Sequence, residues 1–331
     1  MRFKKISYLL VKAIKDFIDP LIYEVDEENT NVSKNPNLGK YYFLFDTNKL
    51  IKGGSYYFKF DSNNIPIVKG NSADNDESFY YNPQAICQYA LSLFNEYIES
   101  KNTQVLKDFL NISEWLVDNI KYLNNIPYWT SDEKRYTNIY AYDDINLISS
   151  MSQSRVISVL LRAYQVTNNN IYLEISENSL EAYKMEYAKG SFLVKQDNLI
   201  FFEENGMPGI LNHFIFSIFG LMDYCRIKGD ETNYKQLLDD AIYSLKEIIS
   251  NYDIGWWSLY DNYTVKGKRR INPATRHYHN IHIQQLLVMY LYTNDEFFYD
   301  ACRQFKSYDT FSNRLKMLFY KFIVVKKMGR L

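Results

Sequence analysis

The sequence predicts a mainly α-helical protein, an incomplete α/α toroid of helical hairpins with a small N-terminal β-hairpin appendage. The chain of 331 residues is 47% hydrophobic with only 12 Gly and 7 Pro, which excludes a disordered or collagen-like chain and allows a sizeable core. Apolar residues at i, i+3, i+4 and i+7 recur at intervals of roughly 60–70 residues, a period typical of helical arrays. Four quartets have this spacing: Ile86/Tyr89/Ala90/Leu93, Ile157/Leu160/Leu161/Tyr164, Ile215/Ile218/Phe219/Met222 and Ile283/Leu286/Leu287/Tyr290.

Each quartet is followed by a short polar loop and a second amphipathic segment, which predicts four helical hairpins. The second helices are expected around residues 104–120, 171–187, 233–250 and 296–306. The linkers between hairpins are long and cover residues 122–149, 190–211 and 251–279. Because long ordered loops on a helical scaffold often carry sites, we expect these linkers to reach over one end of the bundle. An open superhelical binding solenoid is the alternative arrangement.

The N-terminal part has a different composition, because residues 26–78 are rich in Asn, Asp, Gly and Ser. Aromatic runs at 41–45 and 55–60 flank Lys52-Gly53-Gly54, which predicts a β-hairpin, and a further extended piece is expected at 65–70. The predicted organisation has four parts: a basic amphipathic helix (1–25), the β appendage (26–80), the toroid that carries the site (81–307) and a basic amphipathic helix (308–331).

Charge and cysteine content exclude several classes of protein. The chain has 38 Lys and Arg residues against 39 Asp and Glu residues, a net charge of −1. Its overall charge therefore gives no indication of nucleic-acid binding. The three cysteines are far apart and form no CxxC pair, which disfavours a disulfide framework or a zinc site and favours a reducing cytoplasm. No apolar run reaches the roughly 18 residues of a membrane-spanning helix. No Gly-rich phosphate loop or nucleophile elbow is present, and no cofactor or metal is expected. The 31 tyrosines suit clefts that bind flat polar ligands such as sugars.

The segment 251–285 holds the densest group of chemically useful side chains. It contains three of the four histidines, two of the four tryptophans and a basic cluster. Aromatic rings beside cations form a platform for an anionic sugar, because the rings stack on it while a guanidinium binds its carboxylate. The alternatives are that the tryptophans fill the core and the cations are solvated, or that HYHNIH at 277–282 binds a metal, although it matches no fixed zinc spacing.

Two further segments carry weaker signals. Glu203 and Glu204 precede a turn and could supply a general base or a hydroxyl-binding pair, although adjacent glutamates in loops are usually only solvated. Gln153 and Arg155 open the second hairpin after the run Tyr140–Asp144, where the alternative is helix capping and surface charge.

Four motifs in order resemble the C-terminal catalytic domain of the D-glucuronyl C5-epimerase family, which acts on heparosan and heparan. The resemblance covers about residues 41–307. YNPQAICQYAL (81–91) is similar to the family's YNPxxIAQYxL, and MSQSRVISVLLRAYQVT (151–167) to its MAQGxAIS segment. FFEEN (201–205) with LNHFIFSIFGLMDY (211–224) resembles its EEYP and VLNGF stretches. SLYDN (258–262) with NPATRHYHNIHIQQL (272–286) resembles its IYDxR and NxARxxYHxxHIxQL.

The resemblance implies removal of the C5 proton of a uronic acid and reprotonation on the opposite face. It assigns acid/base roles to Tyr278 and Tyr260. The family's third tyrosine aligns with Asn205, its IYDxR arginine aligns with Tyr263, and the large N-terminal β-domains of the animal enzymes are absent. The residues expected to bind the substrate are Arg276, His279, Glu203, Glu204, Asn205, Gln153, Arg155 and Tyr263.

The expected function is therefore uronic acid C5-epimerisation on a bacterial polysaccharide, of capsule or O-antigen type, or on a lipid-linked glycan. A lyase that abstracts the same proton and then eliminates the 4-substituent is one alternative. A glycan-binding or assembly protein that has lost the chemistry is another, and Asn205 is the residue that favours it.

Both ends of the chain carry basic amphipathic patterns. No acidic residue follows position 310, while cations alternate there with large apolar residues, and the first 18 residues have the same character. Lys12 and Lys15 interrupt the N-terminal apolar stretch, so we expect a retained helix and not a signal peptide. Such helices can lie on an anionic bilayer, which predicts a cytoplasmic protein with peripheral contact at the inner face of the membrane. The alternative is that both helices pack on the toroid; a homodimer is left open.

Overall fold

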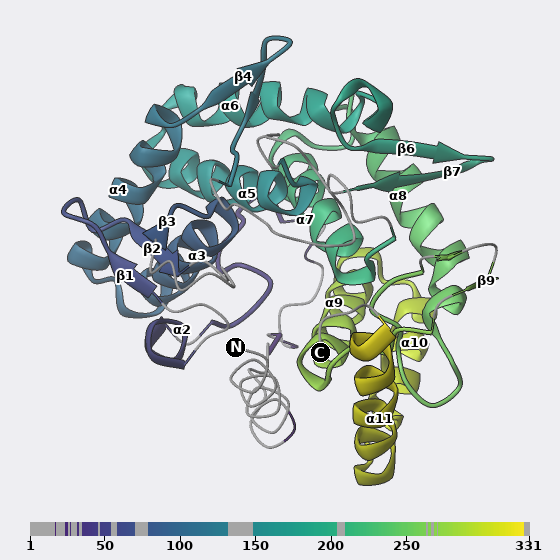
Figure 1. Cartoon of the computed structure of the whole chain (residues 1–331). Helices are drawn as coiled ribbons and strands as arrows, with labels where there is room; N and C mark the ends of the chain where they lie inside the picture. The colour runs from purple at the N-terminus through teal and green to yellow at the C-terminus, as the bar shows by residue number, and fades with distance from the viewer. Residues whose placement is uncertain are drawn as a thin grey trace. The chain divides into compact units, whose positions relative to one another are not determined.

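The computed structural model describes residues 17, 24–25, 27, 32, 35–45, 47–53, 58–69, 79–131, 148–203, 209–262, 264–265, 268–269 and 271–327. The chain divides into two compact units. Figure 1 labels the helices and strands of both and colours them along the chain. Unit 1 comprises residues 1–30, 208–212 and 245–331, and unit 2 comprises residues 31–207 and 213–244. Both are mainly helical, as the sequence predicts, and both also carry small antiparallel sheets, of which only the N-terminal one was expected.

Unit 2 contains the first predicted hairpins. Helices α3 (Pro83–Ser100) and α4 (Thr103–Asp118) pack together, as do α5 (Ser150–Thr167) and α6 (Asn170–Leu180), and α3 also packs against α5. Most of α7 (Leu211–Lys228) and α8 (Lys235–Ile248) belongs to the same unit. The helix predicted over 171–187 is shorter than expected, because a 3₁₀ turn at Glu181–Tyr183 ends it and brings the Tyr183 hydroxyl within 2.6 Å of the Ser150 carbonyl oxygen.

Three of the hairpin loops, those after α3, α5 and α9, share one local pattern, which explains why the chain turns there. Lys101 ends α3 in the left-handed conformation (φ 54°), and the Asn102 side chain then accepts a hydrogen bond from the Gln104 amide to cap α4. The same pairing of a left-handed residue with an N-cap recurs at Asn168-Asn169 and at Asn294-Asp295. Asn tolerates positive φ, and Asn and Asp are strong N-caps, so these dipeptides favour two helices joined by a tight turn.

The predicted hairpin between 41–45 and 55–60 is wrong. Residues 41–45 form no strand, and α2 (Thr47–Gly53) includes most of the expected turn. The aromatic run is part of the core of unit 2, where Phe43 is fully buried and contacts the rings of Phe216 and Phe219. Side-chain burial therefore outweighs the β-propensity of the run.

The strands are short and antiparallel. β1 (Phe58–Phe60), β2 (Pro66–Lys69) and β3 (Phe79–Tyr80) form one sheet in that order, so the extended piece expected at 65–70 is confirmed as β2. Three hairpins complete the described strands: β4 (Lys121–Leu123) with β5 (Ile126–Tyr128), β6 (Leu193–Gln196) with β7 (Leu199–Phe202), and β8 (Thr264–Val265) with β9 (Lys268–Arg269).

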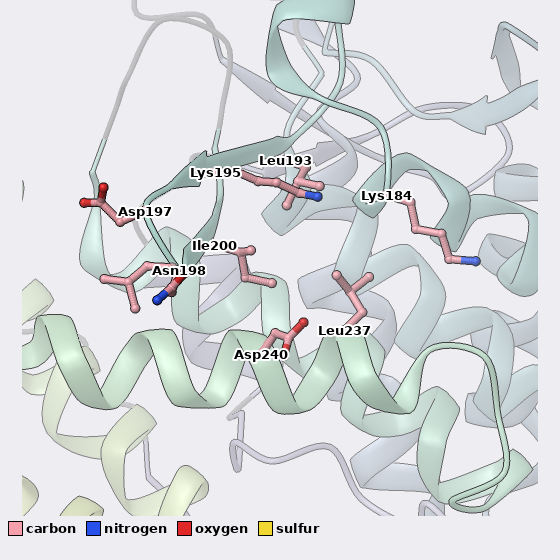
Figure 2. Close-up of a pocket in the computed structure, with 9 residues that line it drawn as sticks. Lys184, Leu193, Lys195, Asp197, Asn198, Ile200, Leu237 and Asp240 are labelled. Carbon is pink, nitrogen blue, oxygen red and sulfur yellow. The ribbon is translucent and has the colours of Figure 1, made fainter.

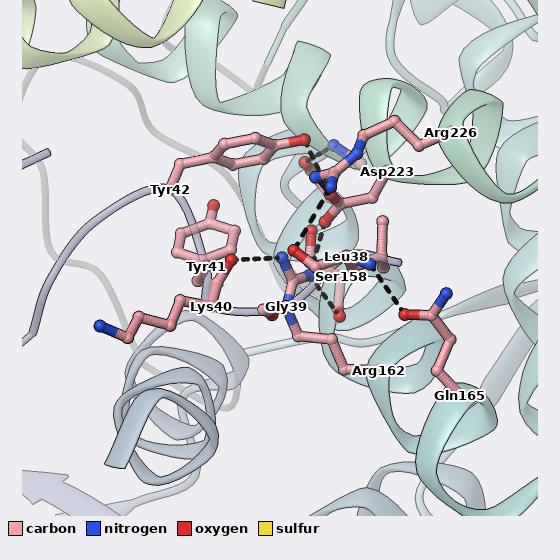
Figure 3. A network of polar contacts seen from close by, with 12 residues as sticks. Leu38, Gly39, Lys40, Tyr41, Tyr42, Ser158, Arg162, Gln165, Asp223 and Arg226 are labelled. Atoms are coloured by element: carbon pink, nitrogen blue, oxygen red, sulfur yellow. Dashed lines mark hydrogen bonds and ion pairs between the residues drawn. The ribbon is translucent and has the colours of Figure 1, made fainter. Parts of the chain in front are cut away.

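A buried polar network ties the segment at 38–42 to α5 and α7 in unit 2 (Figure 3). Arg162 and Asp223 are both fully buried and form an ion pair with 2.7 Å between Nη1 and Oδ2. The Tyr42 hydroxyl donates to the other carboxylate oxygen at 2.7 Å, and Arg226 lies 3.7 Å from that oxygen. Arg162 also donates to the Gly39 carbonyl at 3.1 Å. The network fixes an otherwise irregular segment against two helices, because each of its buried charges is paired.

Unit 1 contains a 3₁₀ turn at Ile249–Tyr252 and the helices α9 (Arg276–Thr293), α10 (Glu296–Ser307) and α11 (Phe311–Lys327). The helix predicted at the C-terminus is α11. Almost all of the helix predicted at 1–25 lies outside the described residues. In the part of the chain that the structure describes, no helix is both long and apolar enough to cross a bilayer.

Candidate active site

Two predicted tyrosines meet in unit 1. The ring centroids of Tyr260 and Tyr278 are 4.9 Å apart, with the rings at 63° in an edge-to-face arrangement. Both side chains are half-buried. Tyr260 precedes α9 by sixteen residues and Tyr278 lies in the first turn of that helix, so the fold and not chain proximity brings the two phenols together.

The local structure positions both phenols. Backbone hydrogen bonds hold Tyr260 on each side, because its amide donates to the Asn272 carbonyl at 2.8 Å and its carbonyl accepts from the Leu211 amide at 3.2 Å. Thr275 caps α9 and accepts from the Tyr278 amide through its side chain. The cap fixes the first turn of the helix and therefore the direction in which Tyr278 leaves the backbone.

A chain of polar contacts lies beside Tyr260. The ammonium of Lys321, on α11, is 5.3 Å from the Tyr260 ring centroid and donates to Asn272 Oδ1 at 2.8 Å. The Asn272 amide group in turn donates to Asp261 Oδ2 at 2.5 Å. Asn272 and Asp261 are both buried. None of these three side chains is among those predicted from the sequence. Asp261 and Asn272 occur within quoted motifs and could have been found there, whereas no motif contains Lys321.

Arg276, the predicted carboxylate ligand, is held at the start of α9. Its Nη1 donates to the Phe17 carbonyl at 2.7 Å, and its Nε lies 3.6 Å from Asp309 Oδ2. Asp309 also accepts from Arg314 at 2.6 Å. Burial alone would raise the pKa of Asp309, but the hydrogen bonds from Arg314 and the charge of Arg276 hold that pKa below its usual value. Arg276 is therefore part of an ion-paired cluster next to Tyr278.

His279 lies in the interior of unit 1, where its ring stacks on Trp257 with 3.8 Å between centroids. Its Nε2 is 3.0 Å from the Phe305 carbonyl, and its Nδ1 is 2.7 Å from Ser258 Oγ, which also lies 2.8 Å from His282 Nδ1. Because a carbonyl only accepts and a hydroxyl carries one proton, the chain runs from His282 to Ser258 to His279 to Phe305.

Both imidazoles in this chain are neutral at physiological pH. Burial lowers the pKa of His279 to about 4 and that of His282 well below its ordinary value. His279 is 1% exposed and both of its ring nitrogens are engaged, so it supports the loop that carries Tyr260. Among the described residues, no group of three or more His, Cys, Asp or Glu side chains is arranged to hold a metal ion.

Three predicted site residues belong to unit 2. Gln153 is buried and donates to the carbonyls of Pro127 and Ser179. Arg155 is buried, and its guanidinium lies 4.4 Å from the centroid of the Phe216 ring. Glu203, at the end of β7, is half-buried. Glu204, Asn205 and Tyr263 lie outside the described residues.

Unit 2 also has a surface hollow of about 310 Å³ between the β6–β7 hairpin and α8 (Figure 2). Its walls carry Lys184, Lys195, Asp197 and Asp240 around the apolar side chains of Ile200 and Leu237. None of the residues predicted from the sequence lines it, and its two cations are balanced by two carboxylates. The hollow therefore adds no residue to the candidate site.

Comparisons with known proteins point to one kind of enzyme. Over 152 residues the chain is 30% identical to D-glucuronyl C5-epimerase of Caenorhabditis elegans, covering 42% of this chain and 25% of that protein. It is 28% identical over 156 residues to an uncharacterized protein of Methanocaldococcus jannaschii, covering 45% and 48%. The chain thus spans a quarter to a half of the curated relatives it matches.

The solved structure of cellobiose 2-epimerase from Bacillus thermoamylovorans B4167 has a similar fold. The TM-score is 0.51 at 14% sequence identity, over 69% of this chain and 60% of that one. The sequence profile described as "D-glucuronyl C5-epimerase C-terminus" matches residues 128–307, which is more than half of the chain and includes both Tyr260 and Tyr278. The chain therefore belongs to the family defined by the C-terminal part of D-glucuronyl C5-epimerase.

Proposed function

We propose that the protein is a uronic acid C5-epimerase of the glucuronate/iduronate type, and that Tyr260 and Tyr278 are its acid/base pair. The observation that carries the proposal is the contact between these two phenols, 4.9 Å apart within the segment that the family profile matches. The substrate would be a uronate-containing polysaccharide, of capsule or O-antigen type, or a lipid-linked glycan.

The reaction requires two proton-transfer groups and no change of oxidation state. The C5 hydrogen lies α to the carboxylate, so its removal by a base moves the C–H electron pair into an enediolate. A second group then delivers a proton to C5 from the opposite face, which restores the carboxylate with inverted configuration. A sugar whose C5 lies between two phenols has to separate rings that are now in contact, so substrate binding is expected to move Tyr260 or Tyr278.

The residues around the pair take different roles in this proposal. Arg276 binds the substrate carboxylate by exchanging its present partner, Asp309, for the ligand. Glu203, Glu204, Asn205 and Tyr263 stay proposed contacts to the sugar. The buried environments of His279, Gln153 and Arg155 favour supporting roles in the scaffold over direct contact with substrate.

Deuterium incorporation tests the proposal. The protein is incubated with a panel of uronate glycans in D₂O, and NMR follows deuterium at C5 together with the ratio of the two epimers. We expect exchange with the parent protein and a loss of at least about 100-fold in Tyr278→Phe and Tyr260→Phe, because general acid–base catalysis contributes about 10²–10⁴-fold. Tyr243→Phe, on the exposed face of α8, is the matched control. Absence of exchange across the panel would count decisively against an epimerase.

A catalytically altered glycan-binding or assembly protein is the second candidate, and Asn205 at the position of a family tyrosine favours it. Glycan affinity that survives Tyr278→Phe, with no turnover in the parent protein, would support this function. A lyase would also need a proton donor for the leaving oxygen, and His279 does not fit this role because its Nε2 already bonds to the Phe305 carbonyl. An ultraviolet-absorbing unsaturated product would identify the lyase reaction.

We further propose that the helical hairpins form an incomplete α/α toroid and that the protein binds peripherally at the inner face of the cell membrane. The fold likeness to cellobiose 2-epimerase supports the toroid. Four large apolar side chains spaced along one stripe of α11 support the membrane contact: Phe311 (66% exposed), Leu315 (49%), Phe319 (64%) and Phe322 (53%).

Sedimentation with anionic liposomes tests the membrane contact. Phe319→Asp is expected to weaken binding, whereas Phe297→Asp, an exposed position on α10, is expected to leave it unchanged. Equal binding by both variants would contradict the role of α11. A change of apparent mass with Phe319→Asp, without lipid, would instead indicate that the stripe forms a homodimer.

A further inference from the structure

α11 lies beyond residue 307, where the family profile ends, yet it belongs to unit 1 and packs on the rest of that unit through one face. Met317 and Val324 are buried, and Lys321 lies between them on the same side of the helix, one turn from each. The apolar stripe of Phe311, Leu315, Phe319 and Phe322 faces away from this side. The helix therefore directs Lys321 toward the rest of unit 1, while the apolar stripe on its opposite face stays exposed.

The position of Lys321 is defined by three contacts. Its Nζ donates to Asn272 Oδ1 at 2.8 Å and to the Pro273 carbonyl at 3.1 Å, and it lies 5.3 Å from the centre of the Tyr260 ring. The backbone carbonyl of Asn272 accepts a hydrogen bond from the Tyr260 amide, and the side-chain amide of Asn272 donates one to Asp261. The same asparagine thus fixes both the ammonium and the backbone that carries the phenol.

We propose that Lys321 is a positioning residue that stabilises the phenolate of Tyr260, so that Tyr260 is the base that removes the C5 proton. This inference rests on the proposed epimerase function. Arg276, the predicted carboxylate ligand, is ion-paired with Asp309 on the Tyr278 side. The sequence also has Tyr263 where the family has an arginine, so the charge comes instead from a helix outside the matched segment.

The asymmetry of charge assigns the two phenols to different steps. The Tyr260 phenolate takes the C5 proton, and the C–H electron pair moves into the carboxylate of the substrate. Tyr278 then donates its phenolic proton to the opposite face of C5. Tyr260 is left protonated and Tyr278 deprotonated, and exchange with solvent restores the starting state.

The titration of Tyr260 reports the effect of Lys321 directly. Among the described residues, Lys321 from α11 and Tyr278 from the start of α9 contact the Tyr260 ring. Asp261 follows Tyr260 in the chain, and the Arg276–Asp309 pair lies on the Tyr278 side. A cation at this range lowers the titration midpoint of an acidic group by about 1–3 pH units. Because Lys321 is only half-buried, we expect a shift near the lower end of that range.

The experiment places fluorotyrosine at position 260 in the full-length protein and follows its titration by fluorine NMR. We expect Lys321→Gln, whose amide can still donate to Asn272, to raise the midpoint by about 1 pH unit. Lys321→Arg should restore the parent midpoint. Lys316→Gln is the matched control, because Lys316 is on the same helix as Lys321 but its ammonium lies over the Trp256 ring. An unchanged midpoint in Lys321→Gln overturns the inference; if that variant does not fold, an unchanged midpoint in Lys321→Met does so.

Deuterium exchange separates failure of this inference from failure of the proposed function. With an active parent protein, Lys321→Gln should lower the exchange rate at neutral pH by about 10-fold and move the alkaline rise of the rate by the same shift as the fluorine midpoint. Equal rates and pH profiles in the parent and in Lys321→Gln overturn the inference. Exchange lacking in the parent protein refutes the epimerase function instead, while the fluorine titration still tests the effect of Lys321 on Tyr260.

Discussion

The buried chain from His282 through Ser258 and His279 to the Phe305 carbonyl makes the stability of the protein depend on pH between neutral and about 4. Burial lowers the pKa of His279 from 6.5 to about 4. The folded state therefore disfavours the proton that the unfolded chain accepts below pH 6.5. The stability from His279 is fully present above pH 6.5 and is lost as the pH falls toward 4, below which it stays constant.

The size of the effect follows from the width of this window. A difference of 2.5 pH units corresponds to about 3 kcal/mol of unfolding free energy, lost at up to about 1.4 kcal/mol per pH unit. The pKa of His282 is lowered in the same direction, so its contribution adds to the loss. Carboxylates with lowered pKa values, such as Asp309, contribute only at the acid end of the range.

Urea unfolding at pH values between about 7.5 and about 4.5 measures this dependence, with tryptophan fluorescence as the readout because Trp257 stacks directly on His279. The parent protein should lose stability steadily over this range. His279→Gln should be less stable at neutral pH but have a shallower slope, while His277→Gln, at a half-buried position, should keep the parent slope. An unfolding free energy that is the same at both ends of the range would refute the reasoning.

Three further predictions concern the core. Asp223→Asn leaves the fully buried Arg162 without its ion pair, so urea unfolding should show a loss of about 3–5 kcal/mol; a loss below 1 kcal/mol would contradict the burial of the pair. In Gly220→Ala the new methyl group would lie 2.9 Å from backbone atoms of Ser154, so the thermal midpoint should fall, by an amount equivalent to about 1–3 kcal/mol. Burial raises the pKa of all three cysteine thiols, so iodoacetamide should label them only in denaturant; rapid labelling of the native protein at neutral pH would show that a thiol is accessible.

Much of the local structure follows from the sequence alone. The apolar quartets predict the buried faces of α3, α5, α7 and α9, and Asn and Asp at the hairpin loops mark where one helix ends and the next begins. Residues close in sequence determine both signals, through helical periodicity and through capping hydrogen bonds, so no knowledge of the tertiary fold is needed to detect them. The sequence also predicts Tyr260 and Tyr278 as the acid/base pair, because the motifs that contain them resemble those of the family, and this role stays a prediction.

What only the tertiary structure decided is the environment of each side chain. The aromatic run at 41–45 has the pattern of a strand, but it fills the core of unit 2 because Phe216 and Phe219 on α7 offer apolar surface to it. His279 is expected from the sequence to bind the substrate, yet Trp257 and Ser258 bury it and engage its ring. Lys321 belongs to a helix with the pattern of a surface element, and the packing of α11 on unit 1 brings it to Tyr260. The sequence predicted the paired helices, because helical periodicity and capping depend on near neighbours in the chain, but it missed α2. The charge and burial around the two phenols depend on contacts between distant segments, and only the folded structure contains them.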